Sequence, residues 1–488
     1  MLAHSAEKSH HNVPTLTAKQ SLLVQSLLQH KNELLQAIQV LPEGHVHVVL
    51  PQQMKQNISW MRQVFGAYDI EPRIFVSHKP SKSNVLIKQA RAENTGLDVS
   101  SKNELISALK NGFSGQKICC TGSKNEEYLS LSIQQGCLHS LDSIEELERY
   151  IDLCKQIAPH EQHKILLRIN SADAPYGGKM SRFGIPVNNL ETCFNLLKEN
   201  SNVYLEGFHM HSGESSGEMR AQEVTLILHY MQRAHALGFT PHTVNIGGGF
   251  PRTFYESKSE TEAFTDSLIQ SLSTKKDITW RGYSYGLSLT DKGAVVGRAG
   301  LESLFKCDDF ECTLRQMLDA DSINASVHKV MGECGFDFMI EPGVNAYDAC
   351  GVTLFKVVEV QDKNNQTLTV LDGNKYNVQF DQIEYMADPV LISEDEIDKK
   401  NESFSTYLVG NLCAEFDVMV KRKVVLNGKP KAGDYLCFMN TAGYTADFNE
   451  TSVHQHPIGQ KIVALKKENG WKFMSEDRFN PYDLIERL

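Results

Sequence analysis

The sequence predicts an α/β protein, with a closed (β/α)8 barrel followed by an all-β domain. Eight short apolar runs, each the length of a buried parallel strand, lie between residues 73 and 342. Most intervals between them have room for a helix, and residues 143–155 and 221–237 show helical spacing. After Gly343 the chain changes to β-rich runs separated by turn residues. The eight expected barrel strands are 73–77, 96–100, 117–121, 136–140, 164–169, 204–209, 242–246 and 336–340.

The bulk composition indicates a globular protein with more than one domain. A chain of 488 residues is too long for one ordinary core. A net charge of −11 argues against a nucleic-acid partner, and no run approaches the roughly 18 apolar residues of a membrane span. The first 14 residues are polar and unlike a secretory signal, and the 11 cysteines show no disulfide framework or metal spacing. We therefore expect a cytoplasmic protein with no metal site.

The chain divides into four expected regions. Residues 1–44 form an N-terminal extension, in which Leu23, Leu27, Leu34 and Ile38 predict one amphipathic helix over 16–40. Residues 45–72 hold a first strand, at 45–50, and a helix; this strand lies outside the eight. The barrel occupies 73–343 and is interrupted at about 255–330 by an insert without clear periodicity. The β domain occupies 344–488.

The expected strand ends carry residues suited to pyridoxal phosphate. Active sites of (β/α)8 barrels lie at the C-terminal ends of the strands. The cofactor needs a lysine for a Schiff base, glycine amides for its phosphate, a flat side chain against its ring and an acid for its pyridine nitrogen. The residues at these ends are Lys79, Asp98, Arg168, His211, Gly247, Gly248, Gly249 and Glu341.

Each of these residues also has a simpler interpretation when it is considered alone. Lys79 could be a solvated strand-end lysine, and Gly247 to Gly249 could be a structural turn. His209 and His211 have a spacing that could bind metal, although packing histidines are commoner. Their shared placement at successive strand ends is what favours the cofactor site.

At these positions the chain resembles the fold-type III pyridoxal-phosphate decarboxylases, the group of ornithine, arginine and diaminopimelate decarboxylases. The resemblance covers about residues 45–470. It rests on Phe-Val-Ser-His-Lys at 75–79, Asp-Val-Ser-Ser-Lys-Asn-Glu-Leu at 98–105, Leu-Arg-Ile-Asn at 167–170, Ser-Arg-Phe-Gly at 181–184, Gly-Phe-His-Met-His at 207–211 and Ile-Gly-Gly-Gly-Phe-Pro at 246–251. In the β domain it rests on Gly-Asn-Leu-Cys-Ala-Glu-Phe-Asp at 410–417 and Ala-Gly-Tyr at 442–444.

The resemblance implies an alanine racemase-like barrel, a mechanism and an assembly. The first strand would join the C-terminal β domain. Lys79 would form the Schiff base and Cys413 would reprotonate Cα, a step that suits a thiol near neutral pH. The active unit would be a head-to-tail homodimer with shared sites, in which Cys413 and the phosphate-binding Tyr444 come from the partner chain.

Three departures from the family pattern leave the substrate open, including whether its centre is L or D. Val344 stands where the family has an arginine near the phosphate. Ala414 follows Cys413 where the classical enzymes carry an acid for the distal amine of the substrate, so Ala414 and Glu415 are candidate substrate-binding positions. The segment 445–449 is shorter than the usual pattern.

Two other functions compete with the decarboxylase prediction. An amino-acid racemase of the same fold type would use a tyrosine base and should lack the 410–417 cysteine motif. A catalytically silent regulator descended from a decarboxylase should have lost Lys79 or Cys413, and both are present.

Overall fold

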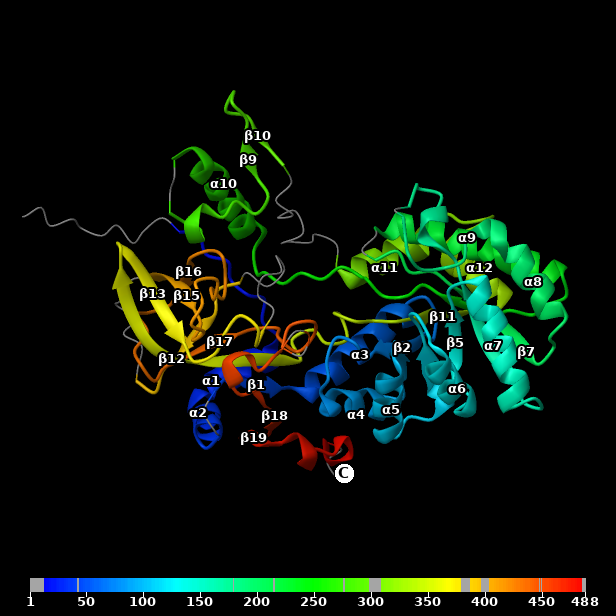
Figure 1. Ribbon diagram of the computed structural model, residues 1–488, viewed down its shortest axis with the longest axis horizontal. Coiled ribbons are helices and arrows are strands. Elements are labelled where there is room, and N and C mark those ends of the chain that lie inside the picture. The colour runs from blue at the N-terminus through cyan, green and yellow to red at the C-terminus, as the bar shows by residue number, and fades with distance from the viewer. Residues whose placement is uncertain are drawn as a thin grey trace, which may run out of the picture. The chain divides into compact units, whose positions relative to one another are not determined.

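The structure is a computed structural model, and Figure 1 shows its fold. It describes residues 13–41, 44–178, 180–213, 216–274, 277–297, 309–378, 387–395, 403–446, 448 and 450–484. Residues 1–12 of the expected extension, 298–308 of the expected insert, and Asp447 and Asn449 lie outside the described residues. The chain forms two compact units. The barrel unit comprises 54–252, 308–348 and 480–488, and the sheet unit comprises 1–53, 253–307 and 349–479.

The barrel unit contains eight parallel strands that close in the order β11-β2-β3-β4-β5-β6-β7-β8. This closure confirms the predicted barrel. The strands are β2 (Arg73–Ser77), β3 (Gly96–Val99), β4 (Ile118–Cys120), β5 (Leu138–Leu141), β6 (His163–Arg168), β7 (Val203–His209), β8 (Thr243–Asn245) and β11 (Asp337–Ile340). Their inward side chains fill the barrel, and Phe75, Cys119, Leu138, Leu166 and Met339 form one buried cluster there.

Helices connect the barrel strands. They are α3 (Pro51–Gly66), which begins at the boundary of the two units, α4 (Asn84–Ala92), α5 (Lys102–Lys110), α6 (Glu126–Gln134), α7 (Ile144–Ile157), α8 (Leu190–Lys198), α9 (Gly217–Ala236), α11 (Phe310–Asp319) and α12 (Val327–Cys334). Local sequence sets several helix starts. Ser143 accepts a hydrogen bond from the backbone of Glu146 at 3.1 Å, and Glu146 reaches back to accept from Asp142 N at 2.8 Å.

The sheet unit is built on β1 (Val46–Val49), which lies between β12 and β18. It pairs antiparallel with β12 (Gly351–Lys363) and parallel with β18 (Gln460–Lys467). The sheet order is β16-β15-β13-β12-β1-β18-β19, and β17 pairs with β12 and β14. The remaining strands are β13 (Gln366–Leu371), β14 (Val390–Ile392), β15 (Phe404–Val409), β16 (Val424–Leu426), β17 (Tyr435–Phe438) and β19 (Gly470–Ser475).

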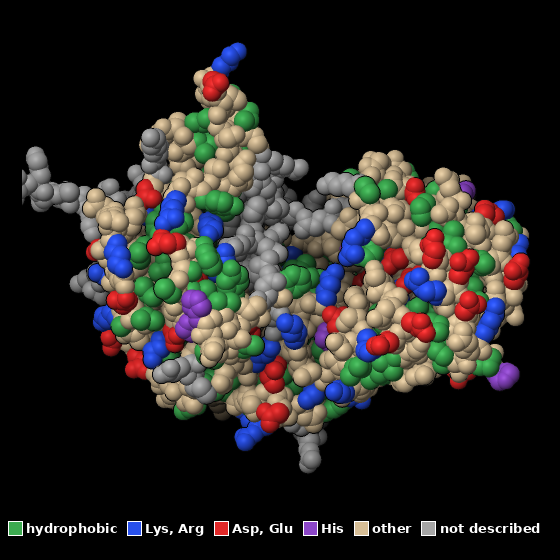
Figure 2. Space-filling model, viewed as in Figure 1, with side chains coloured by type: hydrophobic (Ala, Val, Ile, Leu, Met, Phe, Trp, Pro, Cys, Tyr) green, Lys and Arg blue, Asp and Glu red, His purple; other side chains and the backbone are tan. Residues whose placement is uncertain are grey.

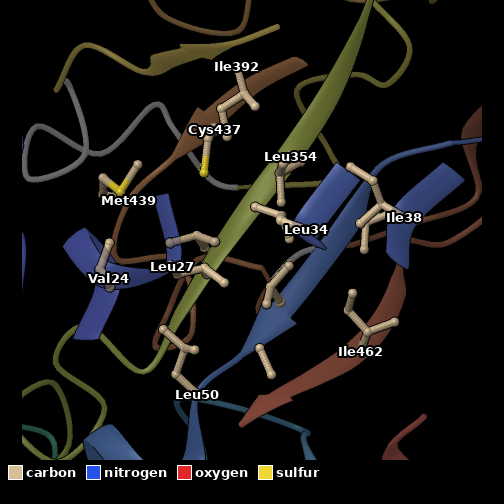
Figure 3. Packing of buried hydrophobic residues seen from close by; sticks show 14 of the residues in the cluster. Val24, Leu27, Leu34, Ile38, Leu50, Leu354, Ile392, Cys437, Met439 and Ile462 are labelled. Carbon is tan, nitrogen blue, oxygen red and sulfur yellow. The ribbon is translucent and has the colours of Figure 1, made fainter. Parts of the chain in front are cut away.

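Two N-terminal helices cover the sheet around β1. Residues 16–40 were expected to form one helix, but α1 (Leu22–Gln29) and α2 (Lys31–Gln39) are separated at His30, whose backbone leaves the helical region. In Figure 3 Leu27 and Leu34 of these helices lie close to Leu354 of β12. Burying this apolar face stabilises two helices that are too short to be stable alone.

The segment expected as an insert divides between the two units. Residues 253–307 belong to the sheet unit, whereas α11 and α12 belong to the barrel unit. The first part contains α10 (Lys258–Thr274) and the hairpin of β9 (Ser288–Leu289) and β10 (Val295–Val296). Trp280 N donates to Lys421 O at 2.8 Å, and Lys423 N donates to Ile278 O at 2.9 Å. This segment therefore extends the hydrogen bonding of the sheet unit.

Acidic and basic side chains are interspersed over the face shown in Figure 2. Among the described helices, none has the length and apolar character needed to cross a bilayer.

Candidate active site

The C-terminal ends of the barrel strands bring together all the barrel residues predicted for the cofactor site. Asp98 lies on β3, Arg168 ends β6, and His211 and the glycine triplet follow β7 and β8. Glu341 follows β11, and Lys79 lies two residues beyond the end of β2. Because parallel strands of a barrel end at one face, residues far apart in sequence converge there.

Lys79 lies on an anchored turn. On this turn His78 N donates to Asp98 O at 2.9 Å, and Tyr347 donates its hydroxyl hydrogen to Ser77 O at 2.8 Å. The Lys79 side chain is exposed, and its positive charge acts on the carboxyls of Asp98 and Glu341. The lysine charge thus acts on both buried acids at this end of the barrel.

Asp98 is a buried carboxyl held by two hydroxyls. Its Oδ1 accepts from Thr121 Oγ1 at 2.6 Å, and its Oδ2 accepts from Ser77 Oγ at 3.2 Å. Burial raises the pKa of Asp98, although the Thr121 hydrogen bond and the Lys79 charge oppose that rise. These contacts fix the carboxyl within hydrogen-bonding distance of the lysine turn.

Glu341 is the second buried carboxyl of the site. Its Oε1 accepts from Asn245 Nδ2 at 2.7 Å, and its Oε2 lies 3.6 Å from His209 Nε2. Burial, and then the negative charge of Asp98, raise the pKa of Glu341 to about 8. A proton is therefore readily shared between this acid and a basic nitrogen placed against it.

The glycine triplet leaves no room for side chains. A Cβ added at Gly247 would lie 2.4 Å from His211 Nδ1, and one at Gly248 would lie 2.3 Å from the carbonyl oxygen of Glu341. Gly249 has a φ of +73°, and its added Cβ would lie 2.5 Å from Gly213 O. Only glycine fits this turn, which brings bare backbone to the edge of the site.

His211 is held as a neutral ring. Gly248 N donates to its Nδ1 at 3.0 Å, so the ring proton belongs on Nε2. Burial, followed by the charges of Arg168 and Lys79, lowers the pKa of His211 to about 3. A neutral imidazole with a fixed tautomer can pack flat against an aromatic ring without bringing a second charge into the pocket.

Arg168 supplies a buried positive charge at the end of β6. Its Nη1 donates to Asp142 Oδ1 at 3.4 Å, and its guanidinium lies 4.7 Å from the centre of the Phe183 ring. Asp142 also accepts from Gly184 N at 3.1 Å, so the 181–184 motif is tied to this arginine.

The barrel residues fit pyridoxal phosphate. The glycine turn excludes every side chain from the place where backbone amides can meet a phosphate, and Asn245 holds Glu341 in position for a pyridine nitrogen. His211 offers a neutral flat ring, and Lys79 offers an amine beside them. The set supplies each of the four groups that the cofactor requires.

The other predicted residues lie in the sheet unit. Cys413 is an exposed thiol on a turn closed by Asp417, which accepts from Leu412 N at 2.8 Å and Lys375 N at 3.0 Å. Ala414 N donates to Leu412 O at 2.8 Å within the same turn. Glu415 forms an exposed ion pair with Arg281 at 2.6 Å, and Tyr444 adopts a left-handed backbone with a φ of +60°.

Sequence reasoning missed the residues that hold these groups. Asn245, Thr121 and Ser77 orient the two acids, and Ser140 lies 2.7 Å from His209 Nδ1. Arg220 of α9 is buried and donates to Gly248 O at 2.8 Å and Gly213 O at 3.1 Å. Asn245 could have been suspected because it immediately precedes the glycine motif; Arg220 has no local signal.

Two family descriptions match the chain. "Pyridoxal-dependent decarboxylase, pyridoxal binding domain" matches residues 52–280, and "Pyridoxal-dependent decarboxylase, C-terminal sheet domain" matches residues 344–442. Together they span more than half of the sequence, and they include Lys79, the glycine triplet and Cys413.

Similar proteins agree with these matches. An uncharacterized protein of Sinorhizobium fredii, y4yA, is 26% identical over 87% of this chain and 88% of its own length. The diaminopimelate decarboxylase of Staphylococcus aureus is 21% identical over 80% of this chain and 82% of its own length. The solved diaminopimelate decarboxylase of M. jannaschii with L-lysine has a TM-score of 0.68 at 18% identity, with 93% of each chain covered. At this identity the structural likeness establishes the fold.

Proposed function

Because the chain belongs to the pyridoxal-dependent decarboxylases, we propose that Lys79 holds the cofactor and that Cys413 returns the proton to the substrate Cα. The protein is a pyridoxal phosphate-dependent amino-acid decarboxylase that acts on a small amino-acid substrate. When bound, the cofactor supplies an electron-withdrawing ring that stabilises the negative charge left as CO2 departs.

The observation that carries the proposal is the joint placement of Glu341 and Lys79 at one end of the barrel. Glu341 retains or shares a proton near neutral pH, since burial and the Asp98 charge raise its pKa to about 8. It is thereby suited to keep a pyridine nitrogen protonated. The amine of Lys79 lies beside the same acids and would bind the cofactor covalently.

The other barrel residues would bind and orient the cofactor. Gly247, Gly248 and Gly249 would form the turn that meets the phosphate, and His211 would pack on the ring face. Gly247 N donates to Asn245 Oδ1 at 2.9 Å and Gly248 N donates to His211 Nδ1 at 3.0 Å, so Gly249 would donate its backbone N–H to the phosphate. Asp98 would offset the positive charge of Lys79, and Arg168 would offset the negative charge of the cofactor phosphate. Tyr444 would add a phosphate contact from a partner chain.

Proton return is assigned to Cys413. Its thiol is exposed on a turn that Asp417 holds through two backbone N–H groups, so it is fixed but accessible. We further propose a homodimer in which Cys413 and Tyr444 of one chain complete the site of the other.

The ten described cysteines are free thiols, which supports a location in the reducing cytoplasm.

We propose a substrate without a free distal amine. Burying an ammonium without a partner costs several kcal/mol, and Ala414 removes the acid that the classical enzymes place there. Glu415, the nearest candidate to replace it, already pairs with Arg281 of the insert at 2.6 Å. A neutral, acidic or acylated side chain therefore fits better than a diamine.

Mapping the lysine adduct tests the assignment of Lys79. Borohydride reduction of the purified protein should fix the cofactor to Lys79, as located by mass spectrometry of peptides. Lys79→Ala should lose the adduct, and Lys82→Ala, three residues away, should keep it. An adduct on any other lysine would refute this assignment.

The substrate assignment is tested by CO2 release from a panel of amino acids in both L and D forms. Ornithine, lysine, arginine and diaminopimelate should give lower kcat/KM than amino acids with neutral or acidic tails. Arg281→Ala, which releases Glu415, should raise diamine turnover relative to wild type. If a diamine has a kcat/KM higher by orders of magnitude than the neutral and acidic amino acids, and Glu415→Ala leaves that preference unchanged, the proposal is wrong.

A further inference from the structure

We propose that the sheet unit binds a divalent transition-metal ion of the zinc class through His45, His47 and Glu450. Each residue offers one ligand atom, and these atoms lie within 4.8 Å of one another. The site uses none of the residues assigned to decarboxylation, and it departs from our expectation from the sequence that the chain has no metal site. Glu450 lies far from the histidines in sequence, so the cluster exists only in the folded chain.

The spacing of the three side chains matches a metal centre. His45 and His47 are two residues apart in extended chain at the start of β1, so they lie on the same face. His45 Nε2 lies 2.8 Å and His47 Nε2 lies 3.6 Å from Glu450 Oε1. Ligand atoms at roughly 2.0–2.2 Å from a tetrahedral zinc ion lie about 3.3–3.6 Å apart. The His47–Glu450 distance already has this size, and the 2.8 Å hydrogen bond between His45 and Glu450 would lengthen by less than about 1 Å.

The buried Nε2 atom of His47, which has no hydrogen-bond partner among the described residues, indicates that a ligand binds here. Its side chain is 4% exposed, yet Nε2 makes no hydrogen bond within the described part of the chain. His47 Nδ1 lies 2.8 Å from Thr353 Oγ1, and Thr353 donates its own hydroxyl hydrogen to Thr441 Oγ1 at 2.8 Å. Thr353 must then accept from His47 Nδ1–H, which leaves a lone pair on Nε2.

This arrangement points an imidazole lone pair at a carboxylate oxygen in a buried place. Glu450 Oε1 already accepts from Gly459 N and lies against His45 Nε2, so the His47 lone pair is the group that lacks a partner. Either a proton on His47 Nε2 or a metal ion shared by the three side chains would supply one, and only the metal ion uses His45, His47 and Glu450 together. The hydroxyl that holds His47 Nδ1 resembles the outer partner that metal-binding histidines commonly have on their second ring nitrogen.

The surroundings are shaped for these three side chains. Gly459 N donates to Glu450 Oε1 at 2.7 Å, and the His45 ring stacks on Phe355 with 5.1 Å between ring centres. A Cβ at Gly459 would lie 2.3 Å from His45 Nε2 and 2.6 Å from His47 Nε2. Any larger residue at 459 would therefore occupy the space that the two nitrogens face.

The ion would have a structural role. It would join β1 to the segment that follows the Tyr444 turn, two parts of the sheet unit about 400 residues apart in the chain. Three protein ligands leave a fourth position for water, but the burial of all three side chains suits a stabilising ion better than a reactive one.

Metal analysis of the full-length holoenzyme tests the proposal. Protein stripped with EDTA and loaded with Zn²⁺ should retain about one ion per chain after desalting. His47→Ala and Glu450→Gln should lose that ion. His229→Ala, which removes an exposed histidine of α9, and the double variant His10→Ala, His11→Ala should retain it. A wild type that retains no zinc, or a His47→Ala variant that retains as much as wild type, overturns the site.

Two further measurements keep the test valid if His47→Ala fails to fold. Co²⁺-loaded wild type should show visible d–d bands without thiolate charge-transfer absorption, since the ligands are nitrogen and oxygen. Bands that carry thiolate absorption, and that vanish in Cys413→Ala, would assign the ion to a cysteine and refute the proposal. Gly459→Ala keeps all three ligands but fills the space beside them, so it should bind zinc at least tenfold more weakly.

Discussion

Gly248 is the residue where the glycine turn comes closest to the chain that carries Glu341. An added Cβ would lie 2.3 Å from the carbonyl oxygen of Glu341, which is backbone and cannot rotate away. Gly248→Ala should therefore lower the unfolding free energy by about 1–3 kcal/mol and weaken cofactor binding. Gly332→Ala is the control, because that helical glycine is exposed and has nothing within 4 Å of its added Cβ. Urea denaturation and cofactor titration measure both effects; equal behaviour of the two variants would contradict the prediction.

Glu341 should make the stability of the cofactor-free protein depend on pH. Its folded pKa of about 8 is above the ordinary value of 4.5, so the folded state binds the proton more tightly than the unfolded chain does. Its contribution is fully present below pH 4.5 and is lost as the pH rises through about 8. We expect a loss on the order of a few kcal/mol across that window.

Glu341→Gln, which cannot ionise, is the matched variant for this pH dependence. Its unfolding free energy should change less between about pH 5 and pH 9 than that of the wild type. Parallel curves for the two proteins, measured by urea denaturation after removal of the cofactor, would show that Glu341 does not have the raised pKa.

At the scale of elements, α9 fixes the turn that follows β8. Arg220 of α9 donates to the carbonyl oxygens of Gly248 and Gly213, and its guanidinium lies 4.1 Å from the centre of the Phe250 ring. These bonds hold the carbonyl groups of the turn toward the helix and so fix the conformation of the glycine turn.

Arg220→Met should lower the unfolding free energy by about 2–4 kcal/mol, because buried carbonyl groups lose their donors. Cofactor affinity should fall with it. Arg233→Met on the same helix removes only an exposed pair with Glu191 and should change stability by less than about 1 kcal/mol. Cofactor titration with parallel denaturation distinguishes the two, and tight cofactor binding by Arg220→Met would exclude this role.

At the scale of the whole molecule, the proposed homodimer predicts complementation between inactive chains. Lys79→Ala and Cys413→Ala each remove one half of a shared site, so a hybrid dimer would keep one intact site of two. Random exchange of equal amounts should restore about a quarter of wild-type activity. Subunit exchange is verified separately with differently tagged chains. No recovery despite exchange would show that each site is built from a single chain.

The sequence by itself determined the barrel and the candidate residues at the ends of its strands. Buried parallel strands need continuous apolar runs, so runs of strand length located all eight strands of the closed barrel. Active sites in this fold lie at the strand ends, so the residues that follow those runs, such as Lys79 and Glu341, could be identified from the sequence as site candidates. The match to pyridoxal-dependent decarboxylases confirms the cofactor and the class of reaction.

Only the tertiary structure decided which side chains hydrogen-bond to those residues, and how the N-terminal extension and the insert are divided into helices and between the two units. Asn245 meets Glu341 across 96 positions, and His47 meets Thr353 across 306, so no local pattern could pair them. The break at His30 and the division of the insert between two units likewise depend on packing against distant strands. Local propensity specifies an element, but its partners are selected by the free energy of burying surfaces that come together only in the folded chain.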